Sequence, residues 1–171
     1  AKMRVEATEE DDVLEALGEH IHEVFVEDAN RLVIWGSGGT LRTIAEGLGF
    51  SPTLLGIDVT LGSEQIGTDL NEQNLLKLIK DHGGECTLLV SPMGGQGFLI
   101  GRGNLQLSPD VLRAVGIDAV LGVVTPAKML TVTQLRIDTG DVELDLDFQN
   151  KKYLKVLQGY RTTRLLRVAS D

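Results

Sequence analysis

Short apolar runs alternate with glycine turns and amphipathic helices from residue 31 onward, and this alternation limits the fold more than any other feature of the sequence. Buried-type strands are expected at residues 32–35, 54–58 and 86–90, with helices at 41–48 and 71–82 between them. Apolar strands separated by helices predict right-handed crossovers and a parallel sheet covered on both faces. The expected class is therefore α/β, with a Rossmann-like, three-layer sheet.

The C-terminal part of the chain follows a different pattern. Beyond residue 100, two helix-start signals and one more buried strand are expected at Ser108-Pro109, Thr125-Pro126 and residues 119–124. Apolar residues then alternate with acids at period two over residues 142–148, behind a turn signal at 138–141. With further strands at 153–157 and 163–168, this predicts an antiparallel C-terminal hairpin portion on a mixed, mostly parallel sheet.

The charge of the chain is unevenly distributed. Residues 1–30 hold ten acids and two bases, a net charge of −8, although the whole chain carries only −9. Apolar residues at three- and four-residue spacing predict that this segment is an acidic amphipathic helix. Residues 151–171 carry six bases against one acid. We therefore expect an N-terminal helix at 1–30 and a single glycine-rich domain at 31–171 that accepts anionic ligands.

The number of cysteines and the hydropathy of the chain narrow the class of protein further. Cys86 is the only cysteine, so a disulfide framework is excluded and a reducing, cytoplasmic compartment is expected. No apolar run approaches the roughly 18 residues of a membrane span. His20 and His22 are two residues apart and cannot form the i, i+4 pair of a helical metal site. Alternating charges near the C-terminus are typical of solvated strands, so a nucleic-acid partner is not expected.

The first candidate site is the glycine turn between the strand at 32–35 and the next helix. Ligands of open α/β sheets bind at the carboxyl ends of strands, where backbone N–H groups and a helix dipole meet a phosphate. The residues concerned are Gly36, Ser37, Gly38, Gly39 and Thr40. The turn equally allows tight strand-to-helix packing. Asp58 is expected at the same edge, either as a hydroxyl acceptor or catalytic base or as a plain turn acid.

Further candidates follow the next strands. Three of the residues in the cluster Gly94, Gly95, Gln96 and Gly97 are glycines, which allow close backbone approach to a ligand. Arg102, Asn104 and Lys128 then supply a planar cation, an amide and an ammonium for phosphate or ribose. Asp138 and Asp141 flank a turn; turn chemistry explains them, and a Mg²⁺ site beside phosphates is the alternative.

Several of these motifs together resemble the C-terminal half of the ATP-NAD kinase-like family. In chain order they are Gly36-Ser37-Gly38-Gly39-Thr40, Thr53-Leu54-Leu55-Gly56-Ile57-Asp58, the block from Pro92 through Gly94-Gly95-Gln96-Gly97 to Gly101-Arg102-Gly103-Asn104, Ser108-Pro109, and Leu135-Arg136-Ile137-Asp138-Thr139-Gly140-Asp141. The resemblance implies a relative of kinases that phosphorylate NAD at the ribose 2′-hydroxyl, with ATP or polyphosphate as donor. NAD, ATP and Mg²⁺ are the ligands it implies.

The same resemblance implies a division of labour. These kinases carry a Gly-Gly-Asp-Gly-Thr motif in an N-terminal domain, and aligning residues 36–40 with it would put Gly38 at the aspartate position. The turn is more similar to the family's later Gly-Pro-Gly-Ser-Thr turn, with Ser37 for Pro and Gly39 for Ser. The chain is therefore expected to be the C-terminal part of a longer protein, to pair with an N-terminal kinase domain, and to be inactive alone.

Two other functions stay open. The glycine turn also resembles the phosphate loops of ribose-5-phosphate isomerase and the sugar-phosphate deaminases. A sugar-phosphate sensor without chemistry, or a phosphosugar isomerase with Asp58 as its base, is therefore the alternative to the kinase hypothesis. Hairpin edges near the C-terminus suggest a homodimer as a further partner.

Overall fold

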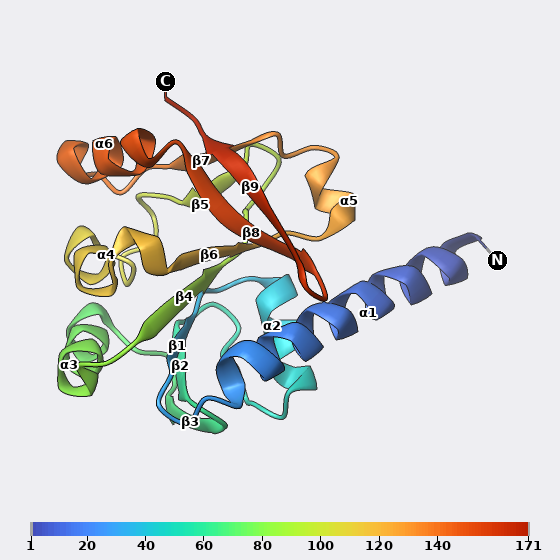
Figure 1. Cartoon of the computed structure of the whole chain (residues 1–171), viewed down its shortest axis with the longest axis horizontal. Coiled ribbons are helices and arrows are strands. Elements are labelled where there is room, and N and C mark those ends of the chain that lie inside the picture. Colours follow the sequence, from blue (N-terminus) through green and yellow to red (C-terminus); the bar gives the residue numbers. More distant parts are fainter. Residues whose placement is uncertain (1, 171) are drawn as a thin grey trace.

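A computed structural model describes residues 2–170 and the side chains of residues 9–170. The helices are α1 (Lys2–Ile21), α2 (Gly39–Gly47), α3 (Glu72–His82), α4 (Pro109–Val115), α5 (Pro126–Met129) and α6 (Val142–Lys151), with a π-helical turn η1 (His22–Val26) and a 3₁₀ turn η2 (Ile117–Ala119). The strands are β1 (Leu32–Trp35), β2 (Asp58–Leu61), β3 (Glu64–Gly67), β4 (Cys86–Val90), β5 (Phe98–Ile100), β6 (Val120–Val123), β7 (Gln134–Ile137), β8 (Tyr153–Gly159) and β9 (Thr162–Val168). Figure 1 shows their arrangement.

The strands form one nine-stranded mixed sheet in the order β3-β2-β1-β4-β6-β8-β9-β7-β5. Strands β1, β4, β6 and β8 are parallel neighbours, and so are β9, β7 and β5. Antiparallel pairing joins β1 to β2, β2 to β3, and β8 to β9. The expected α/β class with a mostly parallel sheet and an antiparallel C-terminal hairpin is confirmed.

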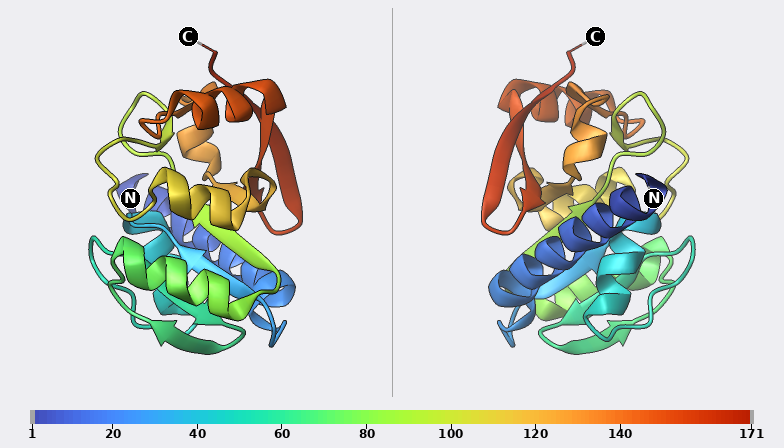
Figure 2. Two further views of the ribbon diagram at one scale, coloured as in Figure 1. Left: turned by 90° about the vertical axis from the view of Figure 1, so that its left-hand side faces the viewer. Right: turned by 90° about the vertical axis from the view of Figure 1, so that its right-hand side faces the viewer.

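Helices cover both faces of the sheet and make three layers. One core cluster joins α1 and α2 to one face through Leu17, Ile21, Leu41, Trp35 and Leu89. The other cluster joins α3, α4 and α6 to the opposite face, through residues such as Leu75, Val111, Phe148, Ile34 and Leu88. Figure 2 shows α3, α4 and α6 on one side and α1, α2 and α5 on the other. Strands that are buried on both faces explain the continuous apolar runs of β1 and β4.

The expected strand at 54–58 is wrong in place and direction. Strand β2 begins at Asp58, runs antiparallel to β1 and pairs Asp58 with Trp35. Leu54 and Leu55, which suggested a strand interior, are exposed. Reversed direction still places Asp58 at the carboxyl end of β1, because the start of an antiparallel neighbour lies beside the end of the strand it pairs with.

The expected strand at 142–148 is also wrong, since these residues form helix α6. Only Leu144 and Phe148 are buried, whereas Val142 and Leu146 face solvent. Residues four apart share one helix face. Every second apolar residue of a period-two pattern, such as Leu144 and Phe148, can therefore form the buried face of a helix as well as belong to a strand. Asp141 is the N-cap of this helix and accepts a hydrogen bond from the Leu144 amide at 3.0 Å, so residues 138–141 lead into a helix and not into a hairpin.

The N-terminal helix projects from the molecule. The second half of α1 packs on the sheet through Leu17 and Ile21, and its first half extends beyond the body (Figure 1). At the opposite end, the tip of the β8–β9 hairpin contacts this helix: the Tyr160 hydroxyl donates to the Glu23 carboxylate at 2.8 Å, and the Arg161 amide donates to Nδ1 of His20 at 2.9 Å. His20 thus takes part in the contact between the hairpin tip and the helix.

Candidate functional site

Three of the predicted segments follow neighbouring parallel strands and therefore lie along one edge of the sheet. The glycine turn at residues 36–40 follows β1, the glycine cluster at 94–97 follows β4, and Lys128 follows β6. Lys128 joins two of these segments, because its ammonium group donates to the carbonyl oxygen of Gly94 at 2.7 Å. The carboxyl-end edge expected from the sequence therefore carries three of the predicted segments.

The glycine turn combines tight packing with an open helix N-terminus. A Cβ at Gly36 would lie 2.8 Å from the carbonyl oxygen of Leu89, so the glycine allows β1 and β4 to approach closely. Gly38 has φ of 126° and is the N-cap of α2. A Cβ at Gly39 would meet no heavy atom within 4 Å, so the first turn of α2 is open on that side. Gly36 therefore fits the packing interpretation, and anion binding at the open first turn of α2 stays a prediction.

Asp58 is a buried carboxylate that braces two loops. It is 5% exposed, and its oxygens accept hydrogen bonds from the Thr53 amide at 2.7 Å, the Thr53 hydroxyl at 3.1 Å and the Asp69 amide at 3.0 Å. The cavity between Asp58 and the glycine turn has a volume of about 10 Å³, which holds about one water molecule. This arrangement favours the plain structural interpretation of Asp58 over a base that faces a substrate.

A larger, polar cavity adjoins the glycine cluster. It has a volume of about 450 Å³ and is lined by Gly95, Gln96, Phe98, Arg136 and the segment 131–134. Gly97, between the lining residues Gln96 and Phe98, has φ of 81°, and a Cβ there would collide with the carbonyl oxygen of Gln134. A cavity of this size is within the range of small-molecule sites, and its guanidinium, amide and hydroxyl groups suit an anionic, hydroxyl-rich ligand.

Arg136, Thr131, Thr133 and Gln134 were not among the residues predicted for the site. Arg136 stands in the motif Leu135-Arg136-Ile137-Asp138, so a basic residue between two apolar ones was the signal that could have indicated it. The two threonines and Gln134 reach the cavity only because β7 lies next to β5 in the sheet. No local pattern predicts that neighbour relation.

Arg102 and Asn104 lie beyond this cavity. The Arg102 guanidinium donates to the Asp138 carboxylate at 2.8 Å, and this ion pair raises the pKa of Arg102. Arg102 lines a second cavity of about 280 Å³, which shares Phe98 and Arg136 with the first. Asn104 closes a turn by accepting the Leu107 amide at 3.2 Å. The structure therefore places Arg102 at a second cavity that shares two lining residues with the one beside the glycine cluster, and it gives Asn104 a local role.

Comparison with known proteins identifies the family. A family model described as the ATP-NAD kinase C-terminal domain matches residues 29–168. The chain belongs to this family. Comparisons with curated proteins and with solved structures return no match. Among residues 2–170, no helix has the length and apolar character needed to cross a membrane.

The side chains of residues 9–170 form no protein-held metal site. Asp138 is paired with Arg102, and Asp141 caps α6 and pairs with Arg113 at 3.0 Å. The Leu144 amide and then Arg113 lower the pKa of Asp141, so this carboxylate stays ionised in its capping role. No group of three or more His, Cys, Asp or Glu among side chains 9–170 is arranged to hold a metal ion. These residues do not fit a protein-bound Mg²⁺.

Proposed function

We propose that this domain binds the nucleotide phosphates of an NAD kinase-like phosphotransferase, an enzyme that converts NAD to NADP. The observation that carries the proposal is the sheet edge shared by the glycine turn and the glycine cluster, where the Lys128–Gly94 hydrogen bond joins the cluster to α5, in a chain of the ATP-NAD kinase C-terminal family. Such an edge offers backbone N–H groups and a helix N-terminus to anionic groups.

Each segment has a distinct task in this proposal. The first turn of α2, open at Gly39, binds a phosphate through its backbone N–H groups. Arg136 and Gln96, which line the 450 Å³ cavity, bind a second anionic or hydroxyl-bearing part of the nucleotide. Lys128 fixes the position of the glycine cluster, and Arg102 adds positive charge at the neighbouring cavity.

The reaction itself is a transfer of a phosphoryl group from ATP or polyphosphate to the ribose 2′-oxygen of NAD. The bond from that oxygen to phosphorus forms as the donor's bridging bond breaks, and the 2′-hydroxyl loses its proton to a base. We assign the base to the N-terminal domain that the family implies, because Asp58 is buried and occupied by three hydrogen-bond donors. This chain alone is therefore expected to bind nucleotide and to form no NADP.

The proposal is tested by ligand-induced thermal stabilisation of the purified chain. NAD, NADP and ATP are compared with ribose 5-phosphate and glucosamine 6-phosphate. A ligand at 100 times its Kd adds about 2.7 kcal/mol, which in a chain of this size raises Tm by about 5–10 °C. Stabilisation by nucleotides supports the proposal. Stabilisation by sugar phosphates alone would replace it with the sugar-phosphate alternative.

The variant Gly39→Asp separates binding from folding. An acid in the first turn of α2 interacts favourably with the helix dipole and meets open space, so stability is retained. The same carboxylate repels a phosphate, and we expect nucleotide affinity to fall at least about tenfold. Gly47→Asp is the matched control, because it lies at the other end of the same helix and also meets open space. Equal affinities of the two variants would show that the α2 N-terminus binds no phosphate.

A further inference from the structure

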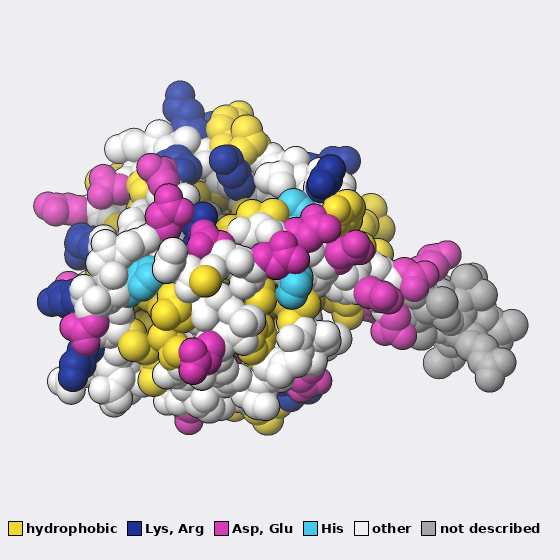
Figure 3. Space-filling model, turned by 60° about the horizontal axis from the view of Figure 1, so that its bottom comes forward, with side chains coloured by type: hydrophobic (Ala, Val, Ile, Leu, Met, Phe, Trp, Pro, Cys, Tyr) yellow, Lys and Arg dark blue, Asp and Glu magenta, His cyan; other side chains and the backbone are white. Residues whose placement is uncertain are grey.

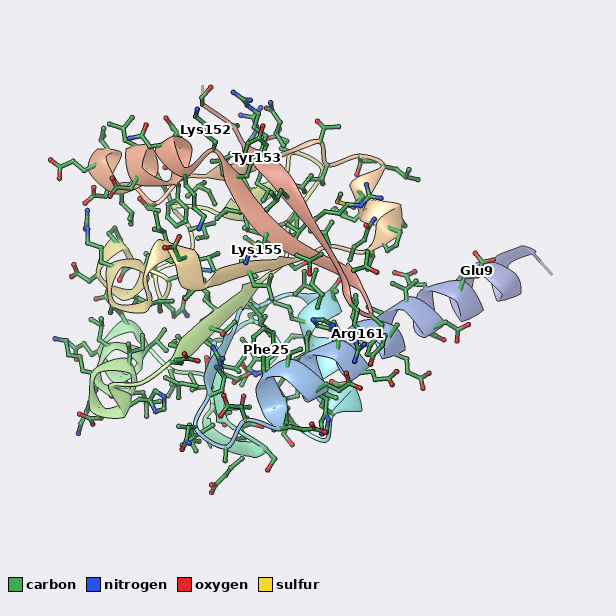
Figure 4. The ribbon with its side chains drawn as sticks, viewed as in Figure 1. Glu9, Phe25, Lys152, Tyr153, Lys155 and Arg161 are labelled. Carbon is green, nitrogen blue, oxygen red and sulfur yellow. The ribbon has the colours of Figure 1, made fainter. Side chains whose placement is uncertain are left out.

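The surface carries two uncovered regions of opposite charge, and the proposed function uses neither. One is the solvent-facing side of α1, and the other is the outer face of the β8–β9 ribbon. Figure 3 shows the Asp and Glu side chains gathered along α1. Figure 4 shows Tyr153 and Lys155 on the ribbon and Lys152 just before it, with Glu9 toward the projecting end of α1.

Five acids form a stripe along α1 and the π-helical turn η1 that continues it. Their three- and four-residue spacing places them on one side of the helix, away from Leu17 and Ile21: Glu9, Asp12, Glu15, Glu19 and Glu23. All five are exposed, and only Glu23 has a hydrogen-bond partner among the described residues, the Tyr160 hydroxyl. Like charges at this spacing repel one another, so a cationic surface that covered the stripe would stabilise it.

The ribbon supplies such a surface. On its outer face Tyr153 pairs with Arg167 and Lys155 pairs with Leu165, and all four side chains are exposed. No helix covers them, because α1 packs on this side of the sheet only near Leu157, at the other end of β8. Among the described residues, neither Lys155 nor Arg167 forms an ion pair within 4 Å.

A groove extends this basic face toward the base of α1. It has a volume of about 720 Å³, and its lining includes Phe25, Arg31, Thr87, Leu121 and Lys155. Arg31 lies over the Phe25 ring with its guanidinium carbon 5.7 Å from the ring centre, and it is paired with Glu85 at 2.7 Å. The lining also includes Asp118, which is paired with Lys151 and whose pKa is lowered by Lys151 and then by Lys155. The groove thus adds apolar side chains and paired charges beside the ribbon.

We infer that the outer face of β8–β9 binds the acidic stripe of α1 from a second copy of this chain. The lengths agree: the uncovered part of the ribbon, residues 153–155 paired with 165–167, spans about 10 Å, and residues 9 to 15 of the helix, at its projecting end, span about 9 Å. The same helix already contacts the tip of this ribbon within one copy, through Glu23 and His20. In a two-fold pair each copy contributes one helix and one ribbon, so the contact forms twice.

Charge reversal with recombination tests this pairing in the full chain. The ribbon variant is Lys155→Glu with Arg167→Glu, and the helix variant is Glu9→Lys with Asp12→Lys. By sedimentation velocity, the unmodified chain is expected to form a dimer whose Kd rises in each variant by at least about tenfold. Mixing the two variants restores a dimer, since each acidic surface then meets a basic one. Native mass spectrometry with one tagged copy identifies the mixed species.

Two controls separate this contact from net charge. Lys77→Glu with Lys80→Glu on α3 matches the ribbon variant in charge, and Asp81→Lys with Asp147→Lys matches the helix variant; all four residues are exposed and lie on the opposite layer. These variants should dimerise like the unmodified chain. Raising salt from about 0.1 to 1 M, which shortens the Debye length from about 10 to 3 Å, should weaken the dimer.

Three outcomes would overturn the inference. An unmodified chain that stays monomeric at low salt leaves this face to another partner, such as the N-terminal domain that the family implies. Dimers of unchanged affinity in the ribbon variant place the interface elsewhere. Failure of the mixed variants to pair, with both folded by circular dichroism, shows that helix and ribbon do not meet.

Discussion

Replacement of Asp58 by alanine tests the structural interpretation of this residue directly. Its carboxylate accepts the amides of Thr53 and Asp69 and the Thr53 hydroxyl, and it is 5% exposed. Removing a buried acceptor costs about 1–3 kcal/mol for each donor left unpaired. Because Thr53 is only half-buried, water reaches part of this site, and we expect a loss of about 3 kcal/mol in unfolding free energy.

The assay is thermal and urea denaturation followed by circular dichroism. For a chain of this size, a loss of about 3 kcal/mol lowers Tm by about 6–12 °C. Asp58→Asn retains one acceptor oxygen but turns an NH₂ group toward a donor, so it should lose roughly half as much. Thr53→Val should cost about 1 kcal/mol in the unmodified chain and nearly nothing beside Asp58→Ala, because the hydroxyl that it removes donates to the Asp58 carboxylate.

The refuting result is a pattern of effects on binding without effects on stability. If the free energy of unfolding of Asp58→Ala lies within about 0.5 kcal/mol of that of the unmodified chain, as for an ordinary surface change, the carboxylate does not stabilise the two loops. Loss of ligand binding in a fully stable Asp58→Asn would assign the residue to the ligand and revive its interpretation as a base. Nucleotide binding that survives in a folded Asp58→Asn supports the brace.

Three further changes follow from the structure. Gly36→Ala should cost about 2–3 kcal/mol in unfolding free energy, because its Cβ would meet the Leu89 carbonyl oxygen at 2.8 Å, while Gly39→Ala should be neutral or stabilising in the same urea titration. Burial lowers the pKa of His20 below its ordinary 6.5. The contribution of His20 to the free energy of unfolding is therefore complete above about pH 6.5 and is lost as pH falls through the pKa of the folded chain. The reason is that a protonated Nδ1 cannot accept the hydrogen bond from the Arg161 amide. Parallel Tm profiles of the unmodified chain and His20→Gln over this pH range would contradict that coupling. Burial also raises the pKa of the Cys86 thiol to about 11, so it should react with a disulfide reagent at neutral pH far more slowly in the folded chain than in urea; equal rates would mean that the thiol is not buried.

The sequence by itself determined the elements whose signals are local. Ser108 and Thr125 cap α4 and α5 where the Ser-Pro and Thr-Pro pairs predict, because an N-cap hydroxyl needs only an amide three residues away. The runs at β1 and β4 are apolar on both faces, which is enough to indicate central strands of a covered sheet. The glycine turn and the glycine cluster were also placed correctly at strand ends.

Only the tertiary structure decided the direction of β2, the helical state of residues 142–148 and the lining of the polar cavity. Direction depends on which strand a segment pairs with, and period-two apolarity satisfies a helix when only Leu144 and Phe148 face the core. Arg136 joins the glycine cluster because β7 lies beside β5, and Lys128 binds Gly94 although 34 residues separate them. Such contacts arise from packing between distant segments, whereas spacing along the chain reports only on neighbours a few residues apart.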